Sequence, residues 1–143
     1  MKRTQDKIKD FVEPQAYEEV RDFAADPARA LAAYRFTDAT SDLLARWLDS
    51  LADLPRGRGA AHALAGLRGV GKSHALAAFG ALVGSEALRQ TVADAHVGSS
   101  ARRLASRRHE VVRVERGTRA ALTDELGDAF AKVFGGDAQG WAS

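Results

Sequence analysis

The chain has 143 residues, of which 45% are hydrophobic and 28% charged, the balance of an ordinary globular domain with a packed core. It contains no cysteine, which excludes disulfides and thiolate metal sites and favours a reducing, cytoplasmic location. Its charged N-terminus is followed by no apolar segment typical of a signal peptide. The sequence contains no run of about 18 apolar residues, so it predicts no membrane-spanning helix.

The first predicted elements are helices, in an N-terminal helical segment that we place at residues 1–56. Asp26 followed by Pro27 is typical of an N-cap and a first helical position, so the sequence predicts a short helix over residues 28–34. The next helix has several N-cap candidates among residues 37–40.

One face of this second helix is apolar. Four apolar side chains recur at i, i+3, i+4 and i+7, the spacing of a single helical stripe. They are Leu44, Trp47, Leu48 and Leu51. We expect this face to be buried. Pro55 ends the helix, and the glycine-containing residues 56–59 are a flexible connector.

The following elements surround a glycine loop. Residues 60–65 are a candidate strand because phosphate-binding loops lie between a strand and a helix. Residues 74–83 are almost wholly apolar, which predicts a helix buried on all sides, here against a sheet. Ser85 is a candidate N-cap for one further helix.

The last third of the chain contains a second candidate strand, residues 109–115, in which Arg113 separates two valines. A helix follows, and five apolar side chains at helical spacing mark its buried face. They are Leu122, Leu126, Ala129, Phe130 and Val133. Gly135 and Gly136 end this helix, and we expect the tail, residues 140–143, to be frayed.

This order of elements predicts an α/β fold: the start of a P-loop NTPase parallel sheet, preceded by the N-terminal helical segment. Residues 57–143 would then be the N-terminal part of a P-loop NTPase domain. Since two strands do not make a stable sheet covered on both faces, we expect this domain to be incomplete within the chain.

The glycine loop, residues 66–73, matches G-x-x-x-x-G-K-[ST] without deviation. Its glycines let the main chain curve tightly and present consecutive N–H groups to a phosphate chain, at the positive end of a helix. A chance match in a chain of this length is roughly a one-in-two-hundred event. The sequence therefore predicts that ATP and Mg²⁺ bind here. The predicted binding residues are Gly66, Leu67, Arg68, Gly69, Val70, Gly71, Lys72, Ser73 and His74.

Within this set, Lys72 should reach the β- and γ-phosphates, and the Ser73 hydroxyl should ligate Mg²⁺. His74 can approach a phosphate, although packing is the simpler expectation for it. Arg68 is expected to face solvent. The motif does not distinguish ATP from GTP.

No acidic catalytic residue can be assigned from the sequence. P-loop ATPases hold Mg²⁺ and orient water with an acid that follows an apolar strand. The nearest candidate, Glu115, follows residues 111–114, but Arg113 interrupts that apolar run. No arginine finger can be named either. The sequence thus predicts nucleotide binding, and ATP hydrolysis only if the catalytic set is complete.

Several stretches between residues 22 and 134 share a family resemblance. They are Asp26-Pro27, Ala30-Leu31, residues 34–38, 44–49, 66–74 and 113–126. In these the chain resembles the N-terminal part of large bacterial P-loop ATPases of AAA type, from BREX phage-defence loci and related uncharacterised groups. The resemblance implies a phage-defence ATPase that forms an oligomer in a longer parent protein. It also implies phosphate and Mg²⁺ ligation by Lys72 and Ser73, with the acidic motif, sensors and arginine finger beyond residue 143.

Two other function classes stay open. One is a small nucleotide or metabolite kinase, although about 65 residues precede the glycine loop and such kinases usually begin with it. The other is a nucleic-acid-binding module without catalysis, since the sequence pI is about 9.2 and arginines gather in one stretch. Those that would contact DNA phosphates are Arg102, Arg103, Arg107 and Arg108. No aromatic residues alternate with these arginines for base stacking, so a solvated surface is the simpler interpretation.

Overall fold

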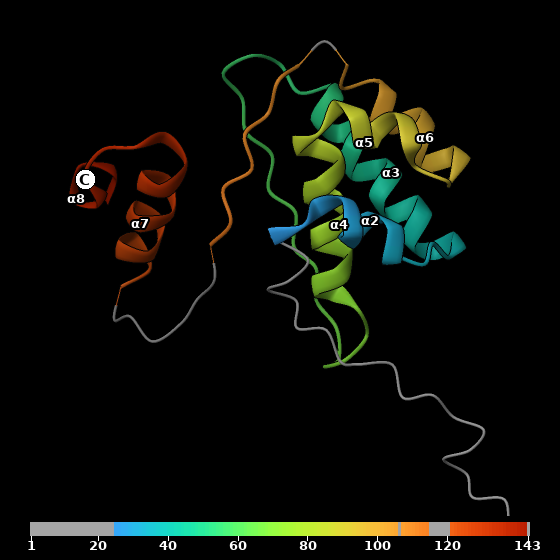
Figure 1. Cartoon of the computed structure of the whole chain (residues 1–143), viewed down its shortest axis with the longest axis horizontal. Helices are drawn as coiled ribbons and strands as arrows, with labels where there is room; N and C mark the ends of the chain where they lie inside the picture. Colours follow the sequence, from blue (N-terminus) through green and yellow to red (C-terminus); the bar gives the residue numbers. More distant parts are fainter. Residues whose placement is uncertain (1–24, 106, 115–120, 143) are drawn as a thin grey trace, which may run out of the picture.

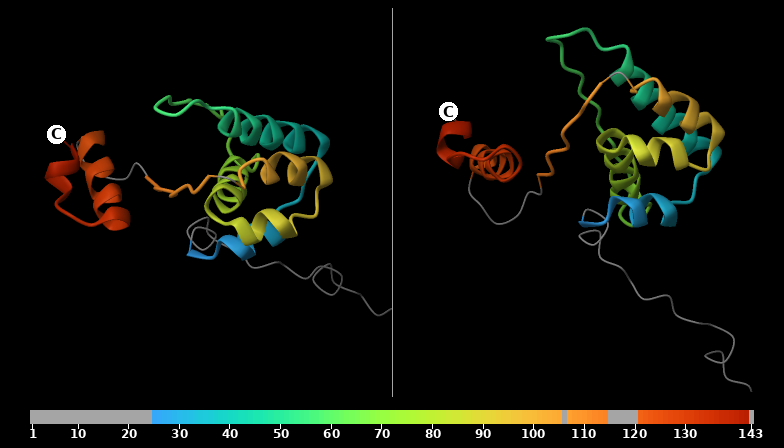
Figure 2. Two further views of the ribbon diagram at one scale, coloured as in Figure 1. Left: turned by 90° about the horizontal axis from the view of Figure 1, so that it is seen from above. Right: turned by 45° about the horizontal axis from the view of Figure 1, so that its top comes forward.

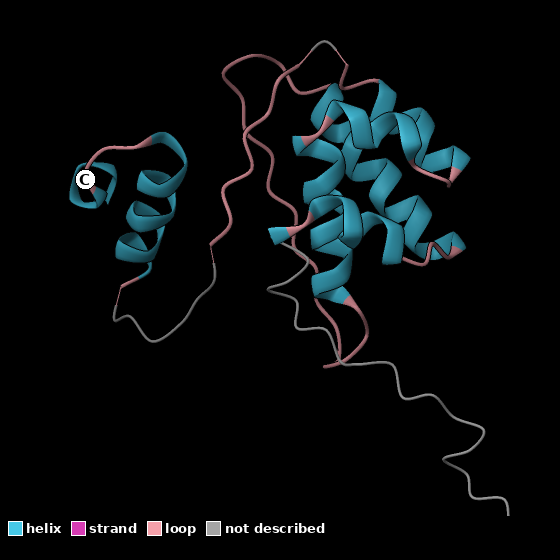
Figure 3. Cartoon of the chain, in the orientation of Figure 1, coloured by secondary structure: helices cyan, strands magenta, loops and turns pink. Residues whose placement is uncertain are grey.

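The computed structural model describes residues 25–105, 107–114 and 121–142. Within these ranges the chain consists of helices joined by loops, and no described residue lies in a strand (Figures 1 and 3). Helices α2 to α6 pack into one bundle, and α7 packs on α8 (Figure 2). The helices are α2 (Pro27–Ala33), α3 (Asp38–Ala52), α4 (Lys72–Gly84), α5 (Glu86–Thr91), α6 (Ala95–Arg102), α7 (Leu122–Phe134) and α8 (Ala138–Ala142).

The predicted α/β fold with a parallel sheet is wrong for the described part of the chain. Residues 60–65 and 109–114, which cover the predicted strands, form no ladder. Alanine fills most of residues 60–65 and is a poor strand former, and two strands alone are marginal in water. The residues of both segments are exposed or only partly buried, so water can reach backbone groups there. Glu115, at the end of the second predicted strand, lies outside the described residues.

Side-chain caps start α2 and α3 close to where the sequence predicts them. The Asp26 carboxylate accepts a hydrogen bond from the Arg29 N–H at 3.0 Å, with Pro27 in the first turn. Thr37 and Thr40 form a capping box at α3, in which each hydroxyl accepts a hydrogen bond from the backbone N–H of the other residue. These side chains satisfy donors that the first turn of a helix leaves unpaired.

The apolar stripe of α3 lies at the centre of the core. Leu44 and Leu48 have no exposed surface and Trp47 keeps 7%, as predicted, while Leu51 is half-buried. Buried side chains of α4, of α6 and of the turn after α6 belong to the same cluster. They are Ala78, Ala81, Leu82, Val83, Val97, Ala101 and Leu104. Removal of these apolar surfaces from water is the main force that holds the bundle together.

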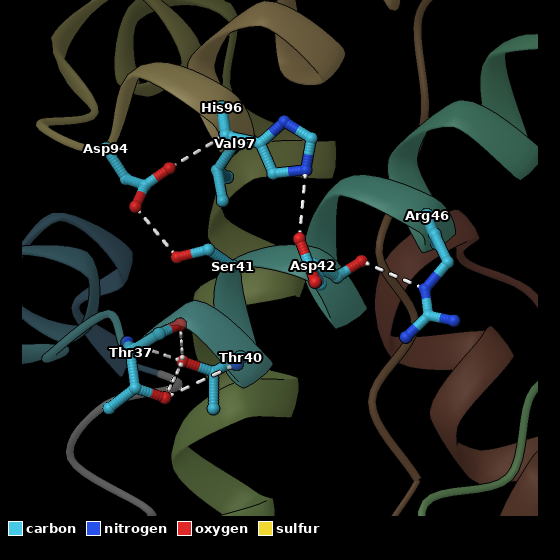
Figure 4. Close-up of polar contacts among 8 residues, drawn as sticks. All are labelled: Thr37, Thr40, Ser41, Asp42, Arg46, Asp94, His96 and Val97. Carbon is cyan, nitrogen blue, oxygen red and sulfur yellow. Dashed lines mark hydrogen bonds and ion pairs between the residues drawn. The ribbon is translucent and has the colours of Figure 1, made fainter.

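Helix α6 is not among the elements that the sequence predicts, and polar contacts fix it to α3 (Figure 4). Asp94 caps α6. Its carboxylate accepts hydrogen bonds from the Val97 N–H at 2.9 Å and from the Ser41 hydroxyl at 2.7 Å. These hydrogen bonds hold the pKa of Asp94 below its ordinary value. His96 Nε2 lies 3.3 Å from an Asp42 carboxylate oxygen at the exposed edge of the same contact.

Helix α4 forms where it is predicted, but it is not buried against a sheet. It packs against α2, α3 and α5. Ala78 and Leu82 are fully buried, whereas Leu76 is 52% exposed. At the C-terminus of α4, the buried Arg89 donates from Nη1 to the carbonyls of Leu82 and Val83, at 3.1 Å each. This cation lies where the helix dipole favours positive charge.

The segments that follow α4 are packed as well. Ser85 caps α5, as predicted, and its hydroxyl accepts from the Leu88 N–H at 3.3 Å. Val111, in the loop after α6, lies against Gly80 and Gly84 of α4, and a Cβ at Gly84 would come within 3.1 Å of the Val111 side chain. The lack of a side chain at these two glycines therefore allows the loop to approach α4 closely.

Helix α7 forms as predicted and ends at Gly135, whose φ is 75°. Its expected buried face is only partly buried, since Leu122 and Val133 are 51% and 41% exposed. The prediction of a frayed tail is wrong for residues up to 142, because they belong to α8. Trp141 donates from Nε1 to the Gly135 carbonyl at 3.0 Å and stacks on Phe130 at 5.7 Å between centroids. These two contacts hold α8 on α7.

Among the helices described, none combines the length and the apolar composition that crossing a membrane requires. The division of the chain at residue 56 stays a prediction. Residues of α3 and α4, which lie on either side of that division, share the core described above.

Candidate phosphate-binding site

The glycine loop, residues 66–73, enters α4 through two glycines in the left-handed region. Gly69 has a φ of 85° and Gly71 a φ of 83°, which side-chain-bearing residues rarely adopt. At both positions, no neighbouring atom lies within 4 Å of where a Cβ would stand. The backbone conformation, and not a lack of space, therefore requires glycine there.

The N-terminus of α4 has no side-chain cap. Its N-cap residue, Gly71, has no side chain that could accept a hydrogen bond, whereas α2, α3, α5 and α6 each begin with a side-chain cap. The N–H groups of Lys72, Ser73 and His74 precede the first intrahelical donor, Ala75, which bonds to the Gly71 carbonyl at 3.0 Å. These donors lie at the positive end of the helix dipole, an arrangement that attracts phosphate oxygens.

The Lys72 side chain folds back across the loop. Its Nζ donates to the Gly66 carbonyl at 2.9 Å and also to the Leu67 carbonyl. Both carbonyls belong to the first two residues of the loop, so the lysine connects the loop's entry to the start of α4. An ammonium has three donors, and the half-exposed Lys72 can turn one of them toward an anion.

The other predicted site residues are exposed around this turn. Leu67 is 81% exposed and Val70 61%, and Arg68, Ser73 and His74 are exposed as well. The Ser73 hydroxyl is thus accessible from solvent. The structure brings the predicted residues together at one end of α4, and their roles as ligands stay predictions.

The segment that leads into the loop is anchored to α3. The His62 ring stacks on the Trp47 ring, with centroids 5.5 Å apart and an interplanar angle of 24°. Leu64 is partly buried against the hydrophobic core. The glycine loop is therefore held from both sides, by α4 at its end and by these two contacts before its beginning.

A shallow hollow lies between α2 and α4, beside the first turns of α4. It is lined by Ala30, Ala33, Tyr34, His74 and Ala77. His74 and Ala77 are three residues apart, so they share the face of α4 that is turned toward α2. Sequence reasoning did not include Tyr34, because only the packing of α2 on α4 brings it near the loop.

Two arginines of the basic stretch make intramolecular contacts with the end of α3. Arg103 Nη1 lies 2.6 Å from Asp49, and Nη2 is paired with Asp53. The hydrogen bond that Arg103 donates to Asp49 and the negative charge of Asp53 raise the pKa of Arg103. Arg107 donates from Nη1 to the Leu51 carbonyl at 3.3 Å. These side chains therefore connect the end of α6 with the end of α3.

The other two arginines proposed to contact DNA are on the surface. Arg108 lies 3.6 Å from Glu110 and is 93% exposed, and Arg102 is exposed on α6. Contact of this stretch with DNA stays a hypothesis. To bind DNA, Arg103 and Arg107 would have to give up their contacts with α3 and contact DNA phosphates instead.

A positively charged neighbourhood surrounds His109. Burial lowers the pKa of His109, and the charges of Arg89 and Arg107 lower it further. Nδ1 of this histidine is buried and has no hydrogen-bond partner within the part of the chain that the structure describes. The neutral imidazole is therefore favoured at neutral pH.

No protein-family model, curated protein or solved structure matches the chain. Among the described residues, no group of three or more His, Cys, Asp or Glu side chains is placed to hold a metal ion.

Proposed function

We propose that residues 66–73 bind the phosphate chain of ATP together with Mg²⁺. The observation that supports this most is one juxtaposition: left-handed glycines, an uncapped helix N-terminus and the Lys72 ammonium lie at the same end of α4. Each supplies donors or positive charge for phosphate oxygens. Within the described residues, the hydrogen bonds that Lys72 donates go to carbonyls and none goes to a carboxylate.

Lys72 is the group that binding would change most. Its hydrogen bonds to two carbonyls hold the ammonium over the loop before any ligand arrives. A charge-assisted hydrogen bond to a phosphate oxygen is stronger than one to a neutral carbonyl, so the lysine gains by exchanging or sharing a donor. The ammonium is thus already close to where it acts.

The Ser73 hydroxyl would supply one ligand to Mg²⁺. This ion keeps several waters and is commonly held by one or two protein groups together with substrate phosphates. A single exposed hydroxyl beside a bound phosphate chain fits that chemistry. The resemblance to BREX-type ATPases supports ATP as the nucleotide, and a phage-defence role in the cytoplasm is part of this proposal.

Binding of a fluorescent ATP analogue with Mg²⁺ tests the proposal. Lys72→Ala should weaken binding by about 10- to 100-fold, because it removes a charged hydrogen bond to phosphate. Lys132→Ala is the matched control, since Lys132 lies on α7 and the change removes the same charge. Circular dichroism should show the helices intact in both variants. Equal affinity in the wild type and Lys72→Ala would refute the proposal.

A further inference from the structure

Residues 107–111 lead from the bundle to the last part of the chain, and contacts at both ends hold this segment on the bundle. At its start, Arg107 donates from Nη1 to the Leu51 carbonyl of α3 at 3.3 Å. At its end, the Val111 side chain lies against Gly84 of α4. From there the chain continues to α7 (Figure 1). The segment therefore connects the C-terminal ends of α3 and α4 to the α7–α8 pair.

His109 lies midway between these two contacts. Two residues span at most about 7 Å of chain, so His109 is within that distance along the backbone of each contact. The buried Arg89 lies at the same end of α4, because its guanidinium donates to the carbonyl of Val83, which directly precedes Gly84. The imidazole is thus placed between a cation on its own segment and a buried cation on α5.

Protonation of His109 is unfavourable in this place. Its Nδ1 is buried and has no hydrogen-bond partner within the described residues, and a charged N–H without an acceptor costs more than an unpaired neutral group. The charged groups that act on His109 there are two cations, Arg89 and Arg107. Burial and both arginines lower the pKa of His109, and a contact with the Arg107 backbone, the smallest of these effects, raises it.

We propose that residues 107–111 dock on the bundle preferentially while His109 is neutral, and that protonation of His109 releases them. Release separates the Val111 side chain from α4 and the Arg107 guanidinium from α3. The segment is then a proton-sensitive connection between the bundle and the α7–α8 pair. It does not depend on the phosphate site, because the glycine loop enters α4 at the opposite end of that helix.

The direction of the pH effect follows from proton linkage. Docking lowers the pKa of His109, so the docked segment binds fewer protons than the released one. Docking is therefore strongest well above the ordinary histidine pKa of about 6.5, weakens as the pH falls through that value and is weakest below the docked pKa. Arginines keep their charge over this range, and histidine is the side chain whose ordinary pKa lies within it.

NMR titration of the histidine side chains in the full chain tests the protonation step. The chain has four histidines, and His109→Gln identifies the signal of His109. Its pKa should be lower in the folded chain than in the same chain unfolded in urea. Arg107→Met should raise this pKa because it removes a positive charge. Arg108→Met is the matched control, since the Arg108 side chain is 93% exposed, and should change the pKa little.

Amide hydrogen exchange at Arg107 and Val111 tests the release. At each pH the wild type is compared with His109→Gln, whose side chain stays uncharged, so the pH dependence of the exchange chemistry cancels. Between about pH 7.5 and about pH 5, the exchange rate of the wild type relative to the variant should rise severalfold, by up to tenfold for each unit by which docking lowers the pKa.

Two results would overturn the proposal. One is a His109 pKa in the folded chain that equals or exceeds the value in the unfolded chain. The other is a ratio of exchange rates that stays constant over this pH range. If His109→Gln fails to fold, backbone assignment identifies the His109 signal and the comparison of folded and unfolded wild type decides.

Discussion

Replacing Trp47 with alanine tests the core that supports the glycine loop. Trp47 is 7% exposed and lies between two aromatic rings. It meets Phe79 of α4 edge-to-face at 5.4 Å and stacks on His62 at 5.5 Å. The substitution therefore removes both a part of the α3–α4 packing and an anchor of the segment that leads into the loop.

The size of the effect follows from the buried surface. A buried aromatic side chain covers roughly 150–250 Å², which at about 25 cal/mol per Å² corresponds to about 4–6 kcal/mol as an upper bound. The alanine side chain still buries a part of this surface, and replacing a buried tryptophan with alanine typically lowers the free energy of unfolding by about 3–5 kcal/mol. We expect Trp47→Ala to lower the free energy of unfolding by that amount, a large share of the roughly 5–15 kcal/mol of a typical domain.

Urea unfolding followed by circular dichroism measures this change. The matched control is Trp141→Ala on α8, the only other tryptophan in the chain. That side chain is 47% exposed, so its loss should cost clearly less. Trp47→Phe should keep most of the stability because a ring remains against Phe79. A loss below about 1 kcal/mol for Trp47→Ala, with an unchanged m-value, would contradict the packing described.

The remaining stability predictions concern Asp94, which joins α3 to α6. Asp94→Ala should lower the free energy of unfolding by about 1–2 kcal/mol, because it removes the N-cap of α6 and the partner of Ser41. Asp94→Asn should keep most of the cap. Equal stability of the wild type and Asp94→Ala in thermal or urea unfolding would contradict this. Because folding lowers the Asp94 pKa below 3.8, the carboxylate's contribution is present above its unfolded pKa and is lost as pH falls through the folded pKa. The difference between wild type and Asp94→Ala should therefore shrink below about pH 4, and a difference that stays constant down to pH 2 would refute this.

The helices that the sequence predicts are those with local signals. Asp26, Thr37 and Ser85 act as caps with donors only three residues away, so the signal and its partner lie in one short segment. The stripe that includes Leu44 and Leu48 likewise needs only the helical period. These features depend on residues that are close in the sequence, so they can be predicted without knowing the tertiary fold.

Strands and α6 depend on contacts that are distant in the sequence. A strand needs a partner ladder, and neither residues 60–65 nor 109–114 finds one among the described residues. Helix α6 contains Gly98 and two serines, weak helix formers, and it forms where Ser41, on α3, completes the cap at Asp94.

The sequence predicts only the part of the candidate site that consecutive residues form. The motif identified residues 66–73, and the left-handed torsions of Gly69 and Gly71 give a physical reason for two of its glycines. Tyr34 precedes the loop by about thirty residues and lines the hollow only because α2 packs on α4. No pattern in the sequence predicts that α2 packs on α4.

The final prediction separates binding from catalysis: with Mg²⁺ present, this chain should release phosphate from ATP no faster than Lys72→Ala does. The loop supplies backbone donors, one ammonium and one hydroxyl, and these bind ground-state and transition-state phosphates alike, which does not accelerate the chemical step. An arginine that stabilises the developing charge can contribute about 10³–10⁵ in rate. Among the described residues, Lys72 donates hydrogen bonds only to loop carbonyls, and the side chains of Arg103 and Arg107 contact α3.

Steady-state phosphate release by the purified chain, compared with Lys72→Ala at the same concentration, decides this point. ATP binding without turnover is the expected result, because an affinity for phosphates requires only the donors at the start of α4, whereas turnover also requires an oriented water and a base or metal-holding acid. Turnover near 1 s⁻¹, the low end of common enzymes, that disappears in Lys72→Ala would show that side chains elsewhere in the chain complete a catalytic site around Ser73.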